Sequence, residues 1–250
     1  MSATKRIVVV GATSSIAAHC ARLWLDRFPA ELVLVGRDAV RTGQVADDLR
    51  VRNPQASIRC LQGNFVEPRK IAALVDEIVR EGRVDSVLIA HGTLPDQATC
   101  ERDLEACLEA LTINGTSAAL FAEAFAGHMQ KADAGTLAVI GSVAGDRGRK
   151  SNYTYGAAKG LLARYLEGLQ HRLAGSRVKV VLIKPGPTDT PMTASMKQKG
   201  MKLASVQSVA RRIVSAMERG TPVVYAPPRW ALIMTVIRHL PAFVFNRLDI

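Results

Sequence analysis

The sequence predicts an α/β protein in which a parallel sheet is covered by helices on both faces. Apolar runs of strand length alternate with amphipathic stretches of helix length, the pattern of repeated strand–helix–strand units with right-handed crossovers. The apolar runs are nearly continuous and rich in Val and Ile, as in strands buried on both faces. No repeat, linker or low-complexity segment divides the 250 residues. We therefore predict a single domain over residues 1–250, with an amphipathic tail over 227–250.

Composition and charge narrow the functional classes. Hydrophobic residues make up 48% and charged residues 22%, as in soluble globular proteins. We find no signal peptide and no apolar run long enough to span a bilayer, so we expect a cytoplasmic protein. The four cysteines lack metal-ligand spacing, so we expect reduced thiols and no metal site. The net charge of +11 suits a phosphate-bearing ligand or an anionic membrane, and equally a solvated basic face. No nucleic-acid-binding motif accompanies it, so we expect no nucleic-acid partner.

The first strand, at residues 7–10, leads into a turn of small residues at 11–17 and a helical pattern from 16 to about 28. A strand, a tight turn and a helix N-terminus form an anion site, because free N–H groups and the helix dipole point at the phosphates of a nucleotide. We therefore predict a dinucleotide site formed by Gly11, Thr13, Ser14, Ser15 and Ile16.

The second strand, at residues 31–36, ends in Arg37 and Asp38. In a nucleotide-binding βαβ unit the residue after this strand lies near the adenosine ribose, where an arginine accommodates a 2′-phosphate. Arg37 therefore favours NADP(H) over NAD(H). Asp38 and the lack of a basic residue in the glycine turn weigh against this preference, and an exposed loop arginine is the alternative interpretation.

The middle of the chain predicts three helices and three strands: helices at about 39–52, 68–81 and 101–131, and strands at 57–61, 85–90 and 136–142. Asn114 lies in the third helix, where asparagine lowers helix propensity and usually binds backbone or water. Ser142 ends the last strand, at the edge where open parallel sheets bind ligands. We interpret His91, after the strand at 85–90, as a loop histidine without a catalytic role.

The segment from Ser151 to Lys159 carries the main catalytic candidates. On a helix, Tyr155 and Lys159 lie four residues apart, so their side chains share one face. An ammonium favours the phenolate and lowers the pKa of the phenol, so that the pair can transfer a proton near neutral pH. This spacing alone is common on protein surfaces. The glycine turn, Asn114 and Ser142, in this chain order, favour catalysis.

The last part of the chain predicts five segments: a strand at 178–183, a Pro-Gly segment at 185–192, a mobile lysine-rich flap at 192–203, a helix at 205–219 and a strand at 223–226. The tail then repeats apolar residues at helical spacing between basic ones: Arg229, Trp230, Ile233, Met234, Ile237, Arg238 and Leu240. Such a face can lie in a membrane interface, so 228–248 is a candidate for contact with the inner membrane face. Packing on the core or on a second subunit is the alternative.

Together these residues resemble the short-chain dehydrogenase/reductase family over essentially the whole chain. The family's catalytic asparagine, serine, tyrosine and lysine fall on Asn114, Ser142, Tyr155 and Lys159. The resemblance implies a Rossmann-type, doubly wound sheet of seven strands, hydride transfer between a nicotinamide cofactor and a carbonyl or alcohol, and a homo-oligomer, dimer or tetramer. It also implies cofactor contacts from Asn64, Phe65, Ala90, Gly92, Tyr155, Lys159, Pro185, Gly186, Thr188 and Thr190.

Three positions depart from the family pattern. Only Gly11 remains of three turn glycines, with Ser15 and Ala17 at the other two positions. Asn64 replaces an aspartate that faces the adenine. Ala90-His91-Gly92 replaces an Asn-Ala-Gly segment. The replacements in the turn are small, so we expect the turn to survive.

A narrower resemblance lies in residues 144–150 and in the tail, which are similar to decaprenylphosphoryl-2-keto-erythro-pentose reductases. It implies a phosphate-bearing or lipid-linked sugar as substrate, with Arg147, Arg149 and Lys150 placed to hold a phosphate. We predict an NADP(H)-dependent enzyme that reduces a ketone or oxidises the alcohol. The alternative is a regulator that binds NADP(H) without turnover. The loss of two of the three turn glycines favours this alternative.

Overall fold

The computed structural model describes residues 4–248 and contains a parallel sheet in the order β3-β2-β1-β4-β5-β6-β7. The strands are β1 (Lys5–Val10), β2 (Ala30–Gly36), β3 (Ser57–Gln62), β4 (Ser86–Ile89), β5 (Thr136–Ile140), β6 (Lys179–Pro185) and β7 (Val223–Ala226). The chain builds outward from β1 to β3 and then crosses to β4 on the other side of β1. A sheet of this order binds ligands beside that reversal, at the carboxyl ends of the strands. The predicted Rossmann-type fold is confirmed.

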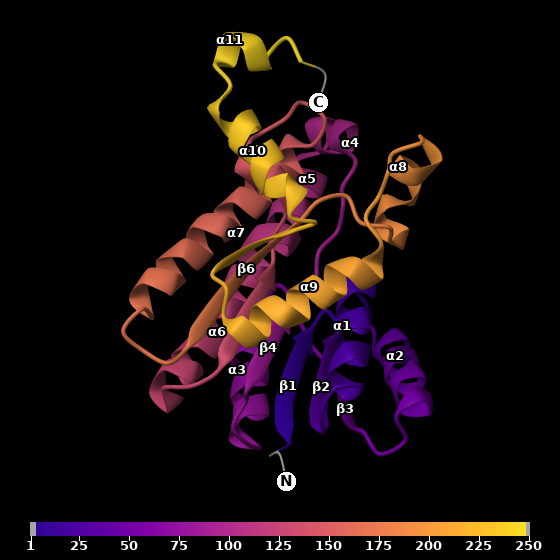
Figure 1. Cartoon of the computed structure of the whole chain (residues 1–250), viewed down its shortest axis with the longest axis vertical. Helices are drawn as coiled ribbons and strands as arrows, with labels where there is room; N and C mark the ends of the chain where they lie inside the picture. The colour runs from indigo at the N-terminus through magenta and orange to yellow at the C-terminus, as the bar shows by residue number, and fades with distance from the viewer. Residues whose placement is uncertain (1–3, 249–250) are drawn as a thin grey trace.

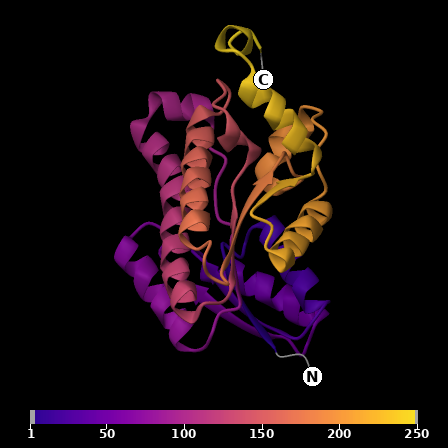
Figure 2. The same cartoon turned by 60° about the vertical axis from the view of Figure 1, so that its left-hand side comes forward.

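Helices cover both faces of the sheet (Figure 1, Figure 2). One face carries α3 (Pro68–Arg80), α6 (Ser117–Ala132) and α7 (Tyr153–Arg172), and the other carries α1 (Ser15–Leu25), α2 (Ala39–Arg52) and α9 (Val206–Arg219). Successive residues of a strand point to opposite faces. In β1, Val8 and Val10 therefore pack in the first layer, while Ile7 and Val9 pack in the second. Both layers are apolar, which explains the nearly continuous apolar strands.

The predicted helix at 101–131 is interrupted in the structure. It consists of α4 (Gln97–Arg102), α5 (Leu104–Leu111), a π-turn η1 (Thr112–Thr116) and α6. Asp103 ends α4 and begins α5, because its carboxylate accepts hydrogen bonds from the N–H groups of Glu105 and Ala106. Helical periodicity did not reveal either break.

The predicted flap is a folded excursion between β6 and α9, with η3 (Pro191–Thr193) and α8 (Ala194–Gln198). A bridge between Thr188 and Ala204 closes its base. The Thr193 hydroxyl donates a hydrogen bond to the carbonyl oxygen of Thr188 at 2.5 Å. These contacts hold the segment beside the carboxyl edge of the sheet.

The tail forms α10 (Arg229–His239) and α11 (Ala242–Phe245), which extend beyond the carboxyl end of the sheet (Figure 1). Met234 is fully buried, whereas Leu232 is 73% and Phe243 is 67% exposed. Packing on the chain's own core therefore leaves apolar side chains of the tail exposed, although these two lie outside the predicted stripe. Within residues 4–248, no helix combines the length and apolarity required to cross a membrane.

Candidate active site

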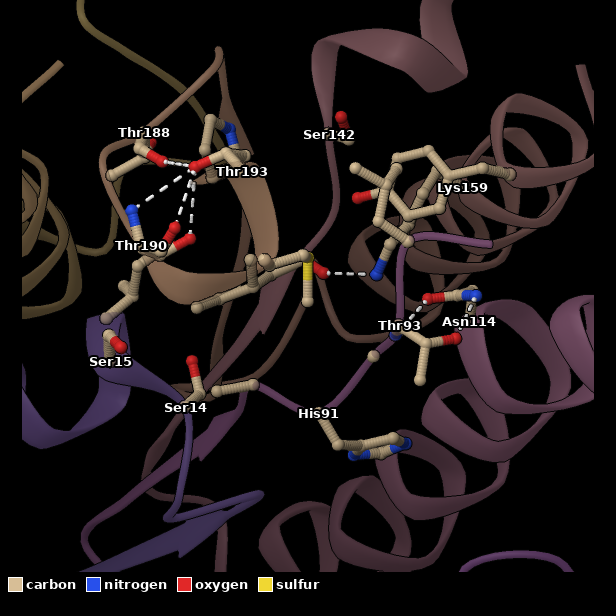
Figure 3. A pocket seen from close by; sticks show the side chains of 18 of the residues that line it. Ser14, Ser15, His91, Thr93, Asn114, Ser142, Lys159, Thr188, Thr190 and Thr193 are labelled. Carbon is tan, nitrogen blue, oxygen red and sulfur yellow. Dashed lines mark hydrogen bonds between the residues drawn. The ribbon is translucent and has the colours of Figure 1, made fainter. Parts of the chain in front are cut away.

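A cavity of about 580 Å³ lies at the carboxyl ends of the central strands. Figure 3 shows part of its lining, with the labelled side chains of Ser142, Lys159 and Asn114 on one side and those of Ser14, Ser15 and Thr190 on the other. All residues predicted to be catalytic or to bind the cofactor line it, except Asn64: Gly11, Thr13, Ser14, Ser15, Ile16, Arg37, Phe65, Ala90, Gly92, Asn114, Ser142, Tyr155, Lys159, Pro185, Gly186, Thr188 and Thr190. The fold therefore brings together residues that are up to 179 positions apart, from Gly11 to Thr190.

The turn after β1 depends on Gly11. Its φ of +84° is one that residues with a Cβ rarely adopt, and a Cβ there would lie 2.5 Å from the backbone nitrogen of His91. Ser14 caps α1 without a side-chain hydrogen bond to another described residue, and the first turn of α1 carries no acidic residue. Free N–H groups at this helix end fit the pyrophosphate of a dinucleotide.

Two arginines line the cavity where β2 passes into α2. Arg37 was predicted from its position after the strand, whereas Arg41, one turn into the helix, was missed. Asp38 accepts a hydrogen bond from the backbone N–H of Arg41 at 3.0 Å and so caps α2. Asn64 lies outside the cavity lining, where it binds Glu67 and the N–H groups at the start of α3. The pair of arginines can hold a phosphate at this end.

Asn114 lies in the π-turn and is fully buried. Its side-chain nitrogen donates to the carbonyl oxygen of Ala110 at 2.9 Å, and its side-chain oxygen accepts from the N–H of Thr93 at 2.9 Å. The side chain therefore connects the widened helix to the loop after β4 (Figure 3). π-turns of this kind occur frequently at functional sites.

Tyr155 and Ser142 face the cavity from the two ends of one loop. Ser142 follows β5 by two residues, and its hydroxyl accepts a hydrogen bond from the N–H of Ala144 at 3.1 Å, which begins η2 (Val143–Asp146). Tyr155 lies in the first turn of α7. Burial raises the pKa of its phenol, and a hydrogen bond with the Ser142 side chain acts in the opposite direction. The phenol is therefore protonated at neutral pH and can donate a proton.

Lys159 is only 3% exposed and donates a hydrogen bond from Nζ to the carbonyl oxygen of Ile140 at 3.0 Å. Burial lowers the pKa of its ammonium to about 8. Its Nζ lies 5.8 Å from the centre of the Tyr155 ring. The prediction that Lys159 lowers the pKa of Tyr155 is wrong for this structure: burial raises that pKa, and the effect that opposes burial comes from the Ser142 hydrogen bond.

His91 also lines the cavity, although sequence reasoning gave it no role. Its Nε2 hydrogen-bonds the Ser117 hydroxyl at 2.9 Å, and its ring packs edge-on against Phe65 and Phe121. Burial, and next the charge of Lys159, lower the pKa of His91 to about 3. The neutral ring is a packing element behind the glycine turn.

The loop between Ser142 and Tyr155 is held by a buried carboxylate. Asp146 accepts a hydrogen bond from Lys184 at 2.6 Å and one from the Tyr225 hydroxyl at 2.8 Å. The ion pair is buried, and burial followed by the bond to Asp146 raises the pKa of Tyr225 to about 12. The loop is thereby fixed to β6 and β7.

Arg147 binds the tail instead of lining the cavity. Its guanidinium donates to the carbonyl oxygens of Ile237 at 2.7 Å and Leu240 at 2.6 Å, and it lies 3.9 Å from the centre of the Phe245 ring. The guanidinium thereby satisfies carbonyl groups at the carboxyl end of α10. The expectation that Arg147 holds a substrate phosphate is therefore wrong.

The tail also contributes to the cavity. Trp230, in the first turn of α10, lines it, and a Cβ at Gly186 would overlap the Trp230 indole. The flap adds Met192, Met196 and Met201. Sequence spacing placed Trp230 in an amphipathic stripe and carried no signal of this contact.

Comparisons with known proteins agree with this geometry. The family model described as short chain dehydrogenase matches residues 5–200. A Streptomyces coelicolor protein named an uncharacterized oxidoreductase is 30% identical over 245 residues, which cover 98% of this chain and 96% of that protein. The cis-4-hydroxycyclohexanecarboxylate dehydrogenase of Sinomonas cyclohexanicum is 30% identical over 191 residues, 76% of this chain and 75% of that protein. A Burkholderia cenocepacia short chain dehydrogenase in complex with NADP has a TM-score of 0.82 at 19% identity, covering 99% and 98% of the two chains.

Proposed function

The chain belongs to the short-chain dehydrogenase family and is an NAD(P)-dependent dehydrogenase/reductase, and on this premise we propose that it transfers hydride between NADP(H) and a ketone or its secondary alcohol. The observation that carries the proposal is the meeting of Asn114, Ser142, Tyr155 and Lys159 in one cavity with the α1 N-terminus at its other end. The oxidoreductase relatives oppose the alternative of a regulator without turnover. The test is NADPH oxidation with a panel of ketones, and NADP⁺ reduction with the alcohols. No turnover in either direction would contradict the proposal.

In this mechanism each side chain has one role. A bound nicotinamide cofactor supplies the hydride. Tyr155 donates its proton to the carbonyl oxygen of the ketone, and Ser142 hydrogen-bonds the same oxygen as negative charge develops. Lys159 would hold the nicotinamide ribose. That Asn114 orders a water which returns the proton stays a prediction.

Lys159 leads to a pH prediction for cofactor binding. Its pKa of about 8 in the free protein lies below the ordinary value of 10.5, so the amine becomes neutral as the pH rises through about 8. If binding requires the ammonium, the Kd for NADPH rises above pH 8, by up to about tenfold per pH unit. Fluorescence titration from pH 6 to 10 measures this. A Kd that is flat through pH 8, or one that rises equally in Lys159→Met, would exclude the role.

Arg37 and Arg41 support a preference for NADP(H), as does the fold neighbour that holds NADP. We expect Arg37→Ser to raise the KM for NADPH by about tenfold or more, because it removes a charge-assisted hydrogen bond to a phosphate, and to leave the KM for NADH nearly unchanged. Arg52→Gln, at the far end of α2, is the control. Equal effects on both cofactors would argue against a 2′-phosphate contact.

The tail supports peripheral contact with an anionic membrane. Leu232, Val236 and Phe243 are exposed, and residues 227–248 contain three arginines but no acidic residue. Apolar side chains with basic neighbours suit an anionic bilayer surface. Because Trp230 joins this tail to the cavity, the arrangement favours a substrate presented at a membrane, as a lipid-linked sugar phosphate would be. Cytoplasmic location and a homo-oligomeric state stay predictions.

Vesicle co-sedimentation tests the tail. We expect full-length protein to bind vesicles with 30% phosphatidylglycerol more strongly than neutral ones, and Leu232→Ser with Phe243→Ser to weaken binding about tenfold, because each removes exposed apolar area. Leu104→Ser with Leu108→Ser, on exposed α5, is the control. Vesicle binding by the tail variant equal to that of wild type would contradict membrane contact. A dimer that is lost only in the tail variant would show that a second subunit covers the tail instead.

A further inference from the structure

Arg149 is a half-buried cation that lacks a partner in the described part of the chain. It lies on the loop between η2 and α7 and lines the cavity. Its Nε is buried and makes no hydrogen bond to any described group, and the same is true of Oδ1 of the neighbouring Asn152. Burial lowers the pKa of the guanidinium, and no described acid opposes that effect. A cation partly removed from water without a counter-charge is costly, so this arrangement favours a ligand that supplies one.

The positions of the charged residues around the cavity distinguish Arg149 from the cations that can bind the cofactor. The lining holds four cations, Arg37, Arg41, Arg149 and Lys159, and one acid, Asp38. Arg37, Arg41 and Asp38 lie at the β2–α2 end, and Lys159 is bound to Ile140. On the side of Ser142 and Tyr155, no carboxylate in the described lining faces Arg149. A dinucleotide that spans the glycine turn and the β2–α2 end therefore leaves Arg149 for the substrate.

The neighbouring cations do not share this property. Arg147 is bound to the tail and Lys184 to Asp146, as described above. The remaining wall on the substrate side is largely apolar, with Met192, Met201 and Trp230. Methionine side chains adapt to ligand shape, so this wall can accept an apolar body of variable outline.

We propose that Arg149 binds an anionic group of the substrate, a carboxylate or a phosphate, so that the enzyme acts on ketones and alcohols that combine an anion with an apolar body. The guanidinium presents paired donors that match either anion in a bidentate geometry. Because Arg149 and Tyr155 flank the start of α7, the bound anion orients the carbonyl toward the phenol. This inference rests on the proposed function, and it adds the residue that selects substrates with an anionic group.

The test uses two matched pairs of ketones with full-length enzyme and NADPH. One pair is 4-oxocyclohexanecarboxylate and 4-methylcyclohexanone, and the other is ribulose 5-phosphate and ribulose. We expect the wild type to prefer the anionic member of at least one pair by about tenfold or more in kcat/KM, and the preferred pair identifies carboxylate or phosphate. Arg149→Gln should reduce that preference by about tenfold or more, mainly through KM, and Arg149→Lys by less, because lysine lacks the planar fork. Arg164→Gln, an exposed arginine of α7, should not change it.

Two results would overturn the proposal: a wild type without preference for either anion, or an Arg149→Gln variant that keeps the preference. Binding provides a readout that is independent of turnover, since Trp230 lines the cavity and its fluorescence reports occupancy. Titration of the NADP⁺-loaded protein with 4-oxocyclohexanecarboxylate and ribulose 5-phosphate should give a Kd for at least one of them that rises about tenfold in Arg149→Gln. If no ketone is reduced but the difference in Kd persists, the proposed reaction is wrong and the anion site is supported. If ketones are reduced but the Kd does not differ, only the proposed anion site is wrong.

Discussion

Tyr155→Phe is expected to lower kcat for ketone reduction by about 1,000-fold, because it removes the proton donor and leaves the ring in place. The phenol faces the cavity beside Ser142, and burial keeps it protonated. Since the change deletes one oxygen, the Kd for NADPH should change by less than about threefold. Stopped-flow measurement of NADPH oxidation, with fluorescence titration of the cofactor, separates the two effects.

Tyr165→Phe is the matched control, on the outer face of the same helix. Its hydroxyl donates a hydrogen bond to Glu123 at 2.8 Å, far from the cavity lining. We expect full activity and a small loss of stability, about 1 kcal/mol. Residual activity of Tyr155→Phe close to that of wild type would remove the proposed mechanism, and parallel losses in both variants would indicate damage to α7.

Gly11→Ala is expected to lower the free energy of unfolding by about 3 kcal/mol and to abolish measurable cofactor binding. The residue has a φ of +84°, and a Cβ would lie 2.5 Å from the His91 nitrogen. The strand end and the glycine turn must therefore separate, which misplaces the N–H groups at the start of α1. Chemical denaturation and NADPH titration measure the two losses.

Gly43→Ala controls for the loss of a glycine in general. Gly43 lies inside α2, and apart from its chain neighbours and the backbone of its own helix no described atom lies within 4 Å of the position that a Cβ would take. Alanine there should stabilise the protein by about 0.5–1 kcal/mol, because glycine is a poor helix former. If Gly11→Ala were as stable as wild type, the turn would not depend on its close approach to His91, in the loop after β4.

The sheet and many of the residues that line the cavity could be predicted from the sequence for a physical reason. In a parallel sheet the carboxyl ends of all strands lie at one edge, so residues that follow strands converge there. Arg37 and Ser142 follow strands, and Tyr155 and Lys159 share a helix face by spacing alone. Their meeting required no knowledge of side-chain packing.

The features that sequence spacing did not reveal depend on tertiary contacts. Arg147 and Arg149 are two positions apart with equal charge, yet one binds carbonyl groups 90 residues away and the other lines the cavity. The pKa of Tyr155 depends on burial, which a four-residue spacing does not specify. Trp230 reaches Gly186 only because β7 places α10 beside the end of β6.

The anchoring of the last two helices determines how the carboxyl terminus can be manipulated. A chain shortened at Pro227 would lose the indole that covers Gly186 and the carbonyl groups that hold Arg147. In such a protein the cavity would be more open to water and would retain substrate less well, even if the tail never binds a membrane. Truncation would therefore alter membrane attachment and the closure of the cavity at the same time. Only point substitutions on the surface of the tail separate the two effects.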